Sequence, residues 1–190
     1  MKTNTFKLLI SACMLVAASC TKQVVDTGNN IEASAKKASA HFIGENFGGG
    51  IVFYIDASGE HGLIAATADK GAATWWNGVY TNTGATDTTI GSGKINTRKI
   101  IQSQGKNGDY AARICATYKG GGFTDWFLPS KNELDELYKQ KNIVGGFEKT
   151  VYWTSSENAM KNAWHQGFGG GYPDRANKSI HSFVRPVREF

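Results

Sequence analysis

Catalytic and metal-binding signatures are missing from this 190-residue chain. It has no Gly-x-Ser-x-Gly elbow, no His-Glu-x-x-His motif and no closely spaced cysteine pair. The glycine triplets at 48–50, 120–122 and 169–171 lack the Lys-Ser/Thr of a phosphate-binding loop, so they indicate turns and close backbone contacts. The four histidines are widely spaced, and no acidic cluster supplies the oxygen ligands that calcium prefers. We therefore expect no enzyme activity, no catalytic residues, no metal and no cofactor.

Cysteine and net charge are also low. Of the three cysteines, Cys13 and Cys20 lie near the N-terminus, and Cys115 lies in the helix-like run YAARICATY, where a buried thiol acting as a small hydrophobe is favoured. The formal net charge is only +5, and no stripe of Lys and Arg is present, so we expect no nucleic acid partner. Basic residues gather between Asn158 and Arg188. This favours either acidic ligands such as sulfated glycans or arginines with a structural role.

The N-terminal segment is typical of an export signal. Lys2 and Lys7 precede an apolar stretch, residues 8–18, which is too short to span a bilayer as a helix. The sequence LVAASC that ends at Cys20 resembles a bacterial lipobox, in which the cysteine is acylated; an ordinary cleaved signal is the alternative. We expect residues 1–19 to be a lipoprotein signal peptide and Cys20 to be lipidated, because two acyl signals give a stable membrane anchor.

The rest of the chain divides into a tether and one domain. Residues 20–41 contain Lys, Ser, Ala, Asn and Gln and few large apolar groups, so a flexible tether is predicted. Residues 42–190 have about the commonest domain size. The expected location is the cell envelope, as an exported and membrane-anchored lipoprotein, with the outer membrane favoured and surface exposure left open.

The predicted elements run in the order strands, helices, strands. The predicted strands are 50–56, 63–67, 151–155, 163–168 and 182–189, and the first two, on either side of a glycine-containing turn, predict a hairpin. The predicted helices are 98–104, which Asn96 and Thr97 would cap, 110–119 and one that begins after Ser130. In this last helix, Ser130 and Glu133 have the spacing of a capping box. The order predicts an α+β fold with a mainly antiparallel sheet and about three short helices.

Four ordered motifs carry a family resemblance: GGFTDWFLPSKNEL, YWTSSE, AW-x-x-x-F and VRPVR. They resemble the Lcl C-terminal domain family, the C-terminal domains of bacterial collagen-like adhesins. That family is similar to C-type-lectin-like and formylglycine-generating-enzyme-like domains. The resemblance implies a compact α+β core in which Trp126, Leu128, Trp153 and Trp164 pack together. It also implies surface-associated binding, with adhesion to a glycosaminoglycan or another polysaccharide.

The C-terminal third also resembles the variable region of retroelement-diversified proteins, in which mutated Asn codons create a ligand-binding face. The matching positions are 158–162, 165, 167, 169–177 and 179–182; an ordinary variable loop is the alternative. We expect the ligand to contact C-terminal loop residues, namely Asn158, Lys161, Asn162, His165, Tyr172, Asp174, Arg175, Asn177 and His181. Tyr172 would offer a stacking face, and Arg175 a fork for carboxylate or sulfate.

The sequence therefore predicts an adhesin-like binding module that recognises an extracellular glycan or protein ligand and is held at the membrane by its N-terminal lipid. A retroelement-diversified protein receptor and a structural component of the envelope are the alternatives. An enzyme related to the formylglycine-generating fold is disfavoured, because the reactive cysteines of those enzymes have no counterpart in this chain.

Overall fold

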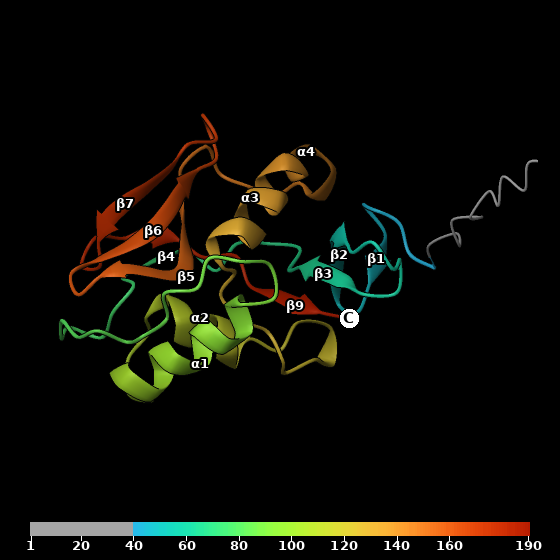
Figure 1. Ribbon diagram of the computed structural model, residues 1–190. Coiled ribbons are helices and arrows are strands. Elements are labelled where there is room, and N and C mark those ends of the chain that lie inside the picture. The colour runs from blue at the N-terminus through green and yellow to red at the C-terminus, as the bar shows by residue number, and fades with distance from the viewer. Residues whose placement is uncertain (1–39) are drawn as a thin grey trace, which may run out of the picture. The chain divides into compact units, whose positions relative to one another are not determined.

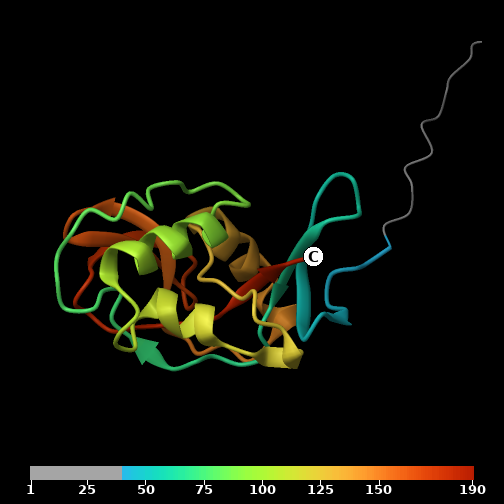
Figure 2. The ribbon, with the colours of Figure 1, turned by 90° about the horizontal axis from the view of Figure 1, so that it is seen from below.

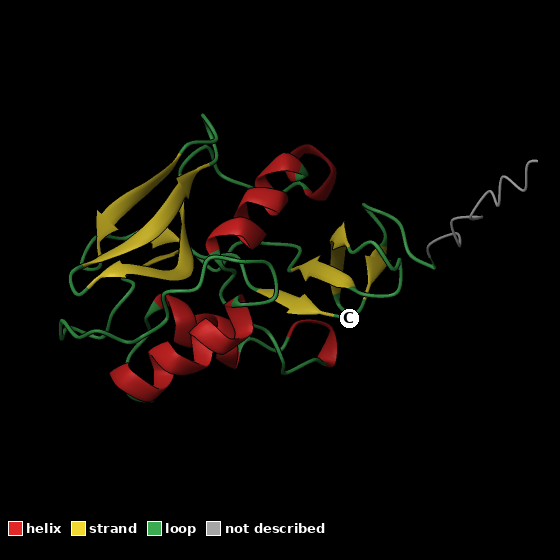
Figure 3. Ribbon diagram, viewed as in Figure 1, coloured by secondary structure: helices red, strands yellow, loops and turns green. Residues whose placement is uncertain are grey.

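The structure is a computed structural model that describes residues 40–190, and the expected signal peptide, Cys20 and nearly all of the tether lie outside the described residues. The described residues belong to one compact unit. They form two sheets and four α-helices, so the predicted α+β class is confirmed (Figure 1, Figure 3). None of the helices described is long and apolar enough to cross a membrane.

The elements have the following bounds. The strands are β1 (Asn46–Phe47), β2 (Gly50–Ile55), β3 (Gly62–Ala65), β4 (Ala72–Ala73), β5 (Val151–Ala159), β6 (Asn162–Gly167), β7 (Pro173–Asn177), β8 (Ser182–Phe183) and β9 (Val187–Glu189). The helices are α1 (Gly93–Gln104), α2 (Ala111–Thr117), α3 (Lys131–Lys139) and α4 (Lys141–Val144), with a 3-10 turn at Gly120–Gly122. One sheet has the order β1-β2-β3-β9 and the other β4-β8-β5-β6-β7. Neighbouring strands are antiparallel except β5 and β8, which pair in parallel.

Two of the glycine triplets lie against each other. Residues 48–50 form the turn into β2, and residues 120–122 form the 3-10 turn. A Cβ on Gly49 would lie 2.8 Å from the carbonyl oxygen of Gly120 and 2.9 Å from the Cα of Gly121. Gly49 and Gly121 also have φ values of +84° and +62°, which side chains disfavour. The two chain segments can therefore cross only because both are glycine at the contact.

The interior contains three apolar clusters. One lies between the five-stranded sheet and helices α1 and α2 and includes Trp153 and Leu128 (Figure 2). A second, around Tyr152, includes apolar residues of α3. The third contains Trp126, whose indole N–H donates to the carbonyl oxygen of Gly120 near the four-stranded sheet. Trp126, Leu128 and Trp153 are buried, but the expectation that they pack together with Trp164 is wrong, because Trp126 belongs to a different cluster and Trp164 is only partly buried.

Helix starts follow tertiary contacts as well as local signals. The capping box of α3 is confirmed: the Ser130 side chain accepts from the Glu133 amide, and the Glu133 side chain accepts from the Ser130 amide. Helix α1 begins at Gly93, five residues earlier than predicted. The polar side chains taken as its cap are buried inside the helix instead. Asn96 donates to the carbonyl oxygen of Asp87, and Thr97 bonds both backbone polar groups of Leu128.

The last predicted strand, residues 182–189, is divided between the two sheets. Strand β8 pairs with β4 and β5, whereas β9 pairs with β3. The segment between β8 and β9 belongs to neither sheet around Pro186, which has no N–H to donate. Residues 173–177, expected to be loop, form strand β7 at the edge of the five-stranded sheet. The segment that was predicted to bind the ligand through loops is therefore largely a β-hairpin.

Candidate functional site

The nine predicted contact residues are not brought together. In the β6–β7 register, Asn162 lies opposite Asn177, Trp164 opposite Arg175 and His165 opposite Asp174. Because side chains alternate between the two faces of a sheet, Asn162, Arg175 and Asn177 share the face of Trp164, whereas His165 and Asp174 lie on the other face. The prediction that all nine residues contact one ligand is therefore wrong for His165 and Asp174, which lie on the opposite face from the others in this hairpin.

The remaining predicted residues lie in turns or at a strand end. Asn158 lies near the end of β5, and Lys161 lies in the turn between β5 and β6. Tyr172 lies at the opposite end of β6, in the turn before β7, where 81% of its surface is exposed. His181 precedes β8 and is exposed. Among the described residues, the side chains found next to the Trp164 ring are those of Lys131 and Arg175, so Tyr172 and His181 are separate candidates.

His165 faces the interior. Its ring centroid is 5.5 Å from that of Trp153, and its Nδ1 lies 3.5 Å from the Ser182 hydroxyl. Burial lowers the pKa of His165, and the charge of Asp174 opposes this effect. A half-buried, neutral imidazole on the core side of the sheet contributes packing rather than a charge for an acidic ligand.

Trp164 is the centre of the exposed face. The Lys131 ammonium lies 5.1 Å from the centroid of its ring, and the Arg175 guanidinium carbon lies 5.4 Å from it. Lys131 begins α3, and its backbone N–H donates to the Ser156 hydroxyl on β5, which fixes the helix start against the sheet. Two cations from distant segments therefore flank one partly exposed indole.

The indole N–H groups distinguish core tryptophans from surface tryptophans. Those of Trp75, Trp126 and Trp153 donate to backbone carbonyls at 2.8, 3.2 and 2.9 Å. Within residues 40–190, the indole N–H of Trp164 has no protein acceptor, and neither has that of Trp76. Since a buried indole N–H is normally satisfied, these two donors are available to water or to a ligand.

A pair of stacked aromatic side chains also lies beside β7. The Tyr80 ring stacks on Trp76 with centroids 3.9 Å apart, and its hydroxyl donates to the Asn177 side chain at 2.6 Å. The Lys161 ammonium lies 5.7 Å from the Tyr80 ring centroid. We call the whole set the aromatic-basic surface. Lys131, Trp164, Arg175 and Asn177 lie on one face of the β6–β7 hairpin, and Tyr80, Lys161 and Trp76 adjoin it through Asn177, although Trp76 also packs against the interior cluster next to α1 and α2.

A buried ion pair lies next to the aromatic-basic surface and stabilises it. Lys178 and Glu157 are almost fully buried and contact each other directly. Lys178 also donates to the carbonyls of Thr81 and Met160, and Glu157 accepts from the amides of Thr83 and Gly84. Burial lowers the pKa of Lys178, an effect that its bond to Glu157 opposes. The pair thus fixes the segment after Tyr80 and the turn that carries Lys161.

The arginines of the VRPVR motif are structural. The Arg185 guanidinium is buried and donates to Asp69 at 2.6 Å and to the Ala66 carbonyl at 2.8 Å. Arg188 donates to both carboxylate oxygens of Asp125, at 2.8 and 2.9 Å, and this holds the pKa of Asp125 below its ordinary value. The basic excess near the C-terminus that a ligand can reach therefore comes from Lys161 and Arg175 rather than from these arginines.

Sequence reasoning missed most members of the aromatic-basic surface. Trp76, Tyr80 and Lys131 come from segments far from β6 and β7 in the chain, and no local pattern relates them. The one usable signal was the capping box, which placed Lys131 at the first position of a helix. Among residues 40–190, no group of three or more His, Cys, Asp or Glu is placed to hold a metal ion. Cys115 is buried, and burial raises the pKa of its thiol well above the ordinary value.

The family model described as the Lcl C-terminal domain matches residues 66–188. This range includes α3, strands β5, β6 and β7, and the VRPVR segment. No curated protein matches the chain.

Proposed function

The chain belongs to the Lcl C-terminal domain family, and on this premise we propose that its aromatic-basic surface binds an anionic extracellular polysaccharide. The family indicates a surface or adhesin-like domain. The arrangement of Lys131, Trp164 and Arg175 is the single observation that supports a ligand of this chemistry.

Each group of this cluster suits a sulfated or carboxylated sugar. The Arg175 guanidinium presents a planar fork that matches carboxylate and sulfate oxygens, and Lys131 adds a compact charge. The indole offers an apolar face and a free N–H donor. Because the cluster is partly exposed, its charges attract a polyanion most strongly at low ionic strength.

We also propose that the protein reaches this ligand as an exported lipoprotein anchored through Cys20. The support is the LVAASC sequence at the end of the expected signal peptide. Cells fed an alkyne-bearing fatty acid should label the wild-type protein and not Cys20→Ser. Equal labelling of both proteins would contradict the anchor without affecting the binding proposal.

The binding proposal is tested with immobilised sulfated, carboxylated and neutral polysaccharides. The purified protein should bind the first two saturably, and Trp164→Ala should weaken binding at least about fivefold, since stacking and a cation site are lost together. Tyr172→Ala removes a more exposed aromatic side chain outside the cluster and should have a small effect. If no polysaccharide is bound and an envelope protein is captured instead, the proposal fails and the diversified-receptor alternative is favoured.

A further inference from the structure

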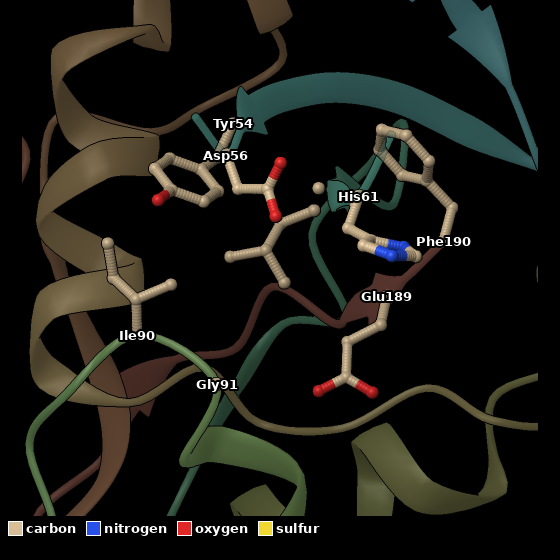
Figure 4. A pocket seen from close by; sticks show the side chains of 9 residues that line it. Tyr54, Asp56, His61, Ile90, Gly91, Glu189 and Phe190 are labelled. Atoms are coloured by element: carbon tan, nitrogen blue, oxygen red, sulfur yellow. The ribbon is translucent and has the colours of Figure 1, made fainter. Parts of the chain in front are cut away.

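A cavity of about 440 Å³ lies away from the aromatic-basic surface. It is bounded by the β2–β3 hairpin, residues 90–91 and the last two residues of the chain (Figure 4). Its lining is mainly apolar and includes Tyr54, Leu63, Ile90 and Phe190. Asp56, His61 and Glu189 are the titratable acidic and imidazole groups that line it.

Backbone hydrogen bonds hold the walls in place. Gly62 and Phe190 exchange two of them, at 3.3 and 3.2 Å, and the Asp56 amide donates to the His61 carbonyl at 2.9 Å. The Gly91 amide donates to the buried Glu133 carboxylate at 2.8 Å. A Cβ on Gly62 would lie 2.6 Å from the Phe190 ring. The cavity is therefore formed before any ligand arrives, which reduces the entropy lost on binding.

The charge of the cavity is negative. One oxygen of Asp56 accepts from the amides of Ser58 and Gly59 and from the Ser58 hydroxyl, and this last bond contributes most to lowering the pKa of Asp56. A backbone hydrogen bond from His61 also lowers the pKa of Asp56, so several donors of the protein already contact this carboxylate. In Glu189, one oxygen accepts from Lys94 at 2.9 Å, and no described group donates to the other. Glu189 thus keeps one oxygen for a ligand, and Asp56 adds negative charge to the cavity.

The two carboxylates lie on opposite sides of an apolar space. In Figure 4, Asp56 and Glu189 are seen across the cavity from each other, with Tyr54 and Ile90 on one flank and His61 and Phe190 on the other. An anion is disfavoured there by both acids. A wholly apolar ligand would leave the carboxylates desolvated without a partner. A cation on an aliphatic stem satisfies both the charge and the apolar walls.

We propose that this cavity binds an alkylammonium group, as carried by the lysine side chain of a partner protein. The methylene stem lies against Tyr54 and Phe190, the ammonium donates to the free oxygen of Glu189, and the negative charge of Asp56 adds to the attraction. This site is distinct from the polysaccharide site and does not depend on it, so one protein would recognise a polyanion on one face and a basic side chain on another.

The test is an NMR titration of the ¹⁵N-labelled protein with three probes. N-acetyl-lysine N-methylamide and butylammonium each carry one ammonium, and N-acetyl-norleucine N-methylamide is the uncharged counterpart of the first. Saturable shifts of the Gly62, Gly91 and Phe190 amides with both ammonium probes support the proposal. Shifts with butylammonium alone would retain the ammonium site but exclude a lysine side chain within a peptide. Equal shifts with the norleucine probe would overturn the proposal.

Two charge-matched variants complete the test. Glu189→Gln should weaken binding of the lysine probe roughly three- to fivefold, as expected for one partly exposed ion pair. Glu148→Gln removes an acid of equal charge that lines a different cavity and should leave the affinity unchanged. Unchanged binding in Glu189→Gln, with its amide spectrum otherwise native, would also overturn the proposal.

Discussion

The ammonium of Lys178 and the carboxylate of Glu157 form an ion pair in the interior, 21 residues apart in the chain and in direct contact in the fold. Four backbone groups complete it: the carbonyls of Thr81 and Met160 and the amides of Thr83 and Gly84. The pair joins the segment that carries Tyr80 to the turn that carries Lys161, so it connects the stability of the domain to the geometry of its aromatic-basic surface.

Replacing one partner of this pair should be costly. Lys178→Met leaves the Glu157 carboxylate buried without its counter-charge, and breaking a buried pair in this way costs about 3–5 kcal/mol. The free energy of unfolding from urea titrations measures the loss. The double variant Lys178→Met/Glu157→Gln removes both charges and should be more stable than Lys178→Met alone. A double variant at least as unstable as the sum of the single changes would contradict this account.

The crossing of the glycine triplets predicts a large difference between two adjacent substitutions. Gly121 and Gly122 both have left-handed φ values, +62° and +82°. A Cβ on Gly121 would overlap the Gly49 Cα, whereas nothing lies within 4 Å of one on Gly122. Gly122→Ala should therefore cost only the backbone strain, about 1–2 kcal/mol. Gly121→Ala should cost about 1–3 kcal/mol more, as in other overpacked sites. Equal losses in thermal or urea unfolding would show that the crossing is looser than described.

Glu133 predicts a specific pH dependence of stability. Burial raises the pKa of Glu133 from 4.5 to about 7, against the hydrogen bonds from Ser130, Gly93 and Gly91. The folded state therefore holds a proton that the unfolded state has lost between these values. The contribution to stability is fully present below about pH 4.5 and is lost as the pH rises through about 7.

The measurement compares the wild-type protein with Glu133→Gln in urea at several pH values from about 4.5 to 7.5. The free energy of unfolding of the wild type should fall with rising pH relative to that of the variant, which cannot ionise at this position. Comparing slopes cancels the opposite contribution of His165, whose lowered pKa makes folding more favourable as the pH rises through that range. Parallel curves would show that the hydrogen bonds keep Glu133 ionised.

The sequence predicted those structural features that depend only on residues close together in the chain. The β2–β3 hairpin and the α3 capping box depend on residues close in the chain, and both are confirmed. Asn96 and Thr97 do not cap the helix, because their side chains donate to the backbone carbonyls of Asp87 and Leu128. Strand β7 has a weak β signal in PDRAN and forms through its pairing with β6.

The candidate site was less predictable than the fold for a related reason. His165 and Arg175 both lie in the polar C-terminal segment, and only the β6–β7 register assigns them to opposite faces. Tryptophan is a residue type usually found in the core, and the partial exposure of Trp164 depends on how much of its face of the sheet α3 covers. Lys131 joins it because the α3 start is bonded to Ser156. Contacts between segments that are distant in the chain leave no periodic pattern in a single sequence.

Salt should separate the charge contribution from the stacking contribution at the aromatic-basic surface. The affinity for a sulfated polysaccharide should fall steadily as sodium chloride rises from about 0.05 to 0.5 M, since the Debye length drops from above to below about 10 Å over this range. Trp164→Phe keeps an aromatic face and loses the N–H, so its salt dependence should match that of the wild type at a lower affinity. An affinity independent of salt would contradict recognition by Lys131 and Arg175.

The proposed polysaccharide site beside Trp164 can be tested by the equilibrium binding of one sulfated polysaccharide to two charge-matched double variants. Lys131→Gln/Arg175→Gln removes the two cations beside Trp164, and Arg98→Gln/Lys106→Gln removes two exposed cations in and after α1. Both variants should unfold at nearly the wild-type temperature, because surface charges contribute little to stability. The first should lose affinity by tenfold or more, as about 1.4 kcal/mol would give, and the second should change little. Equal losses in the two variants would contradict the proposed site, because binding would then follow net charge and not this surface.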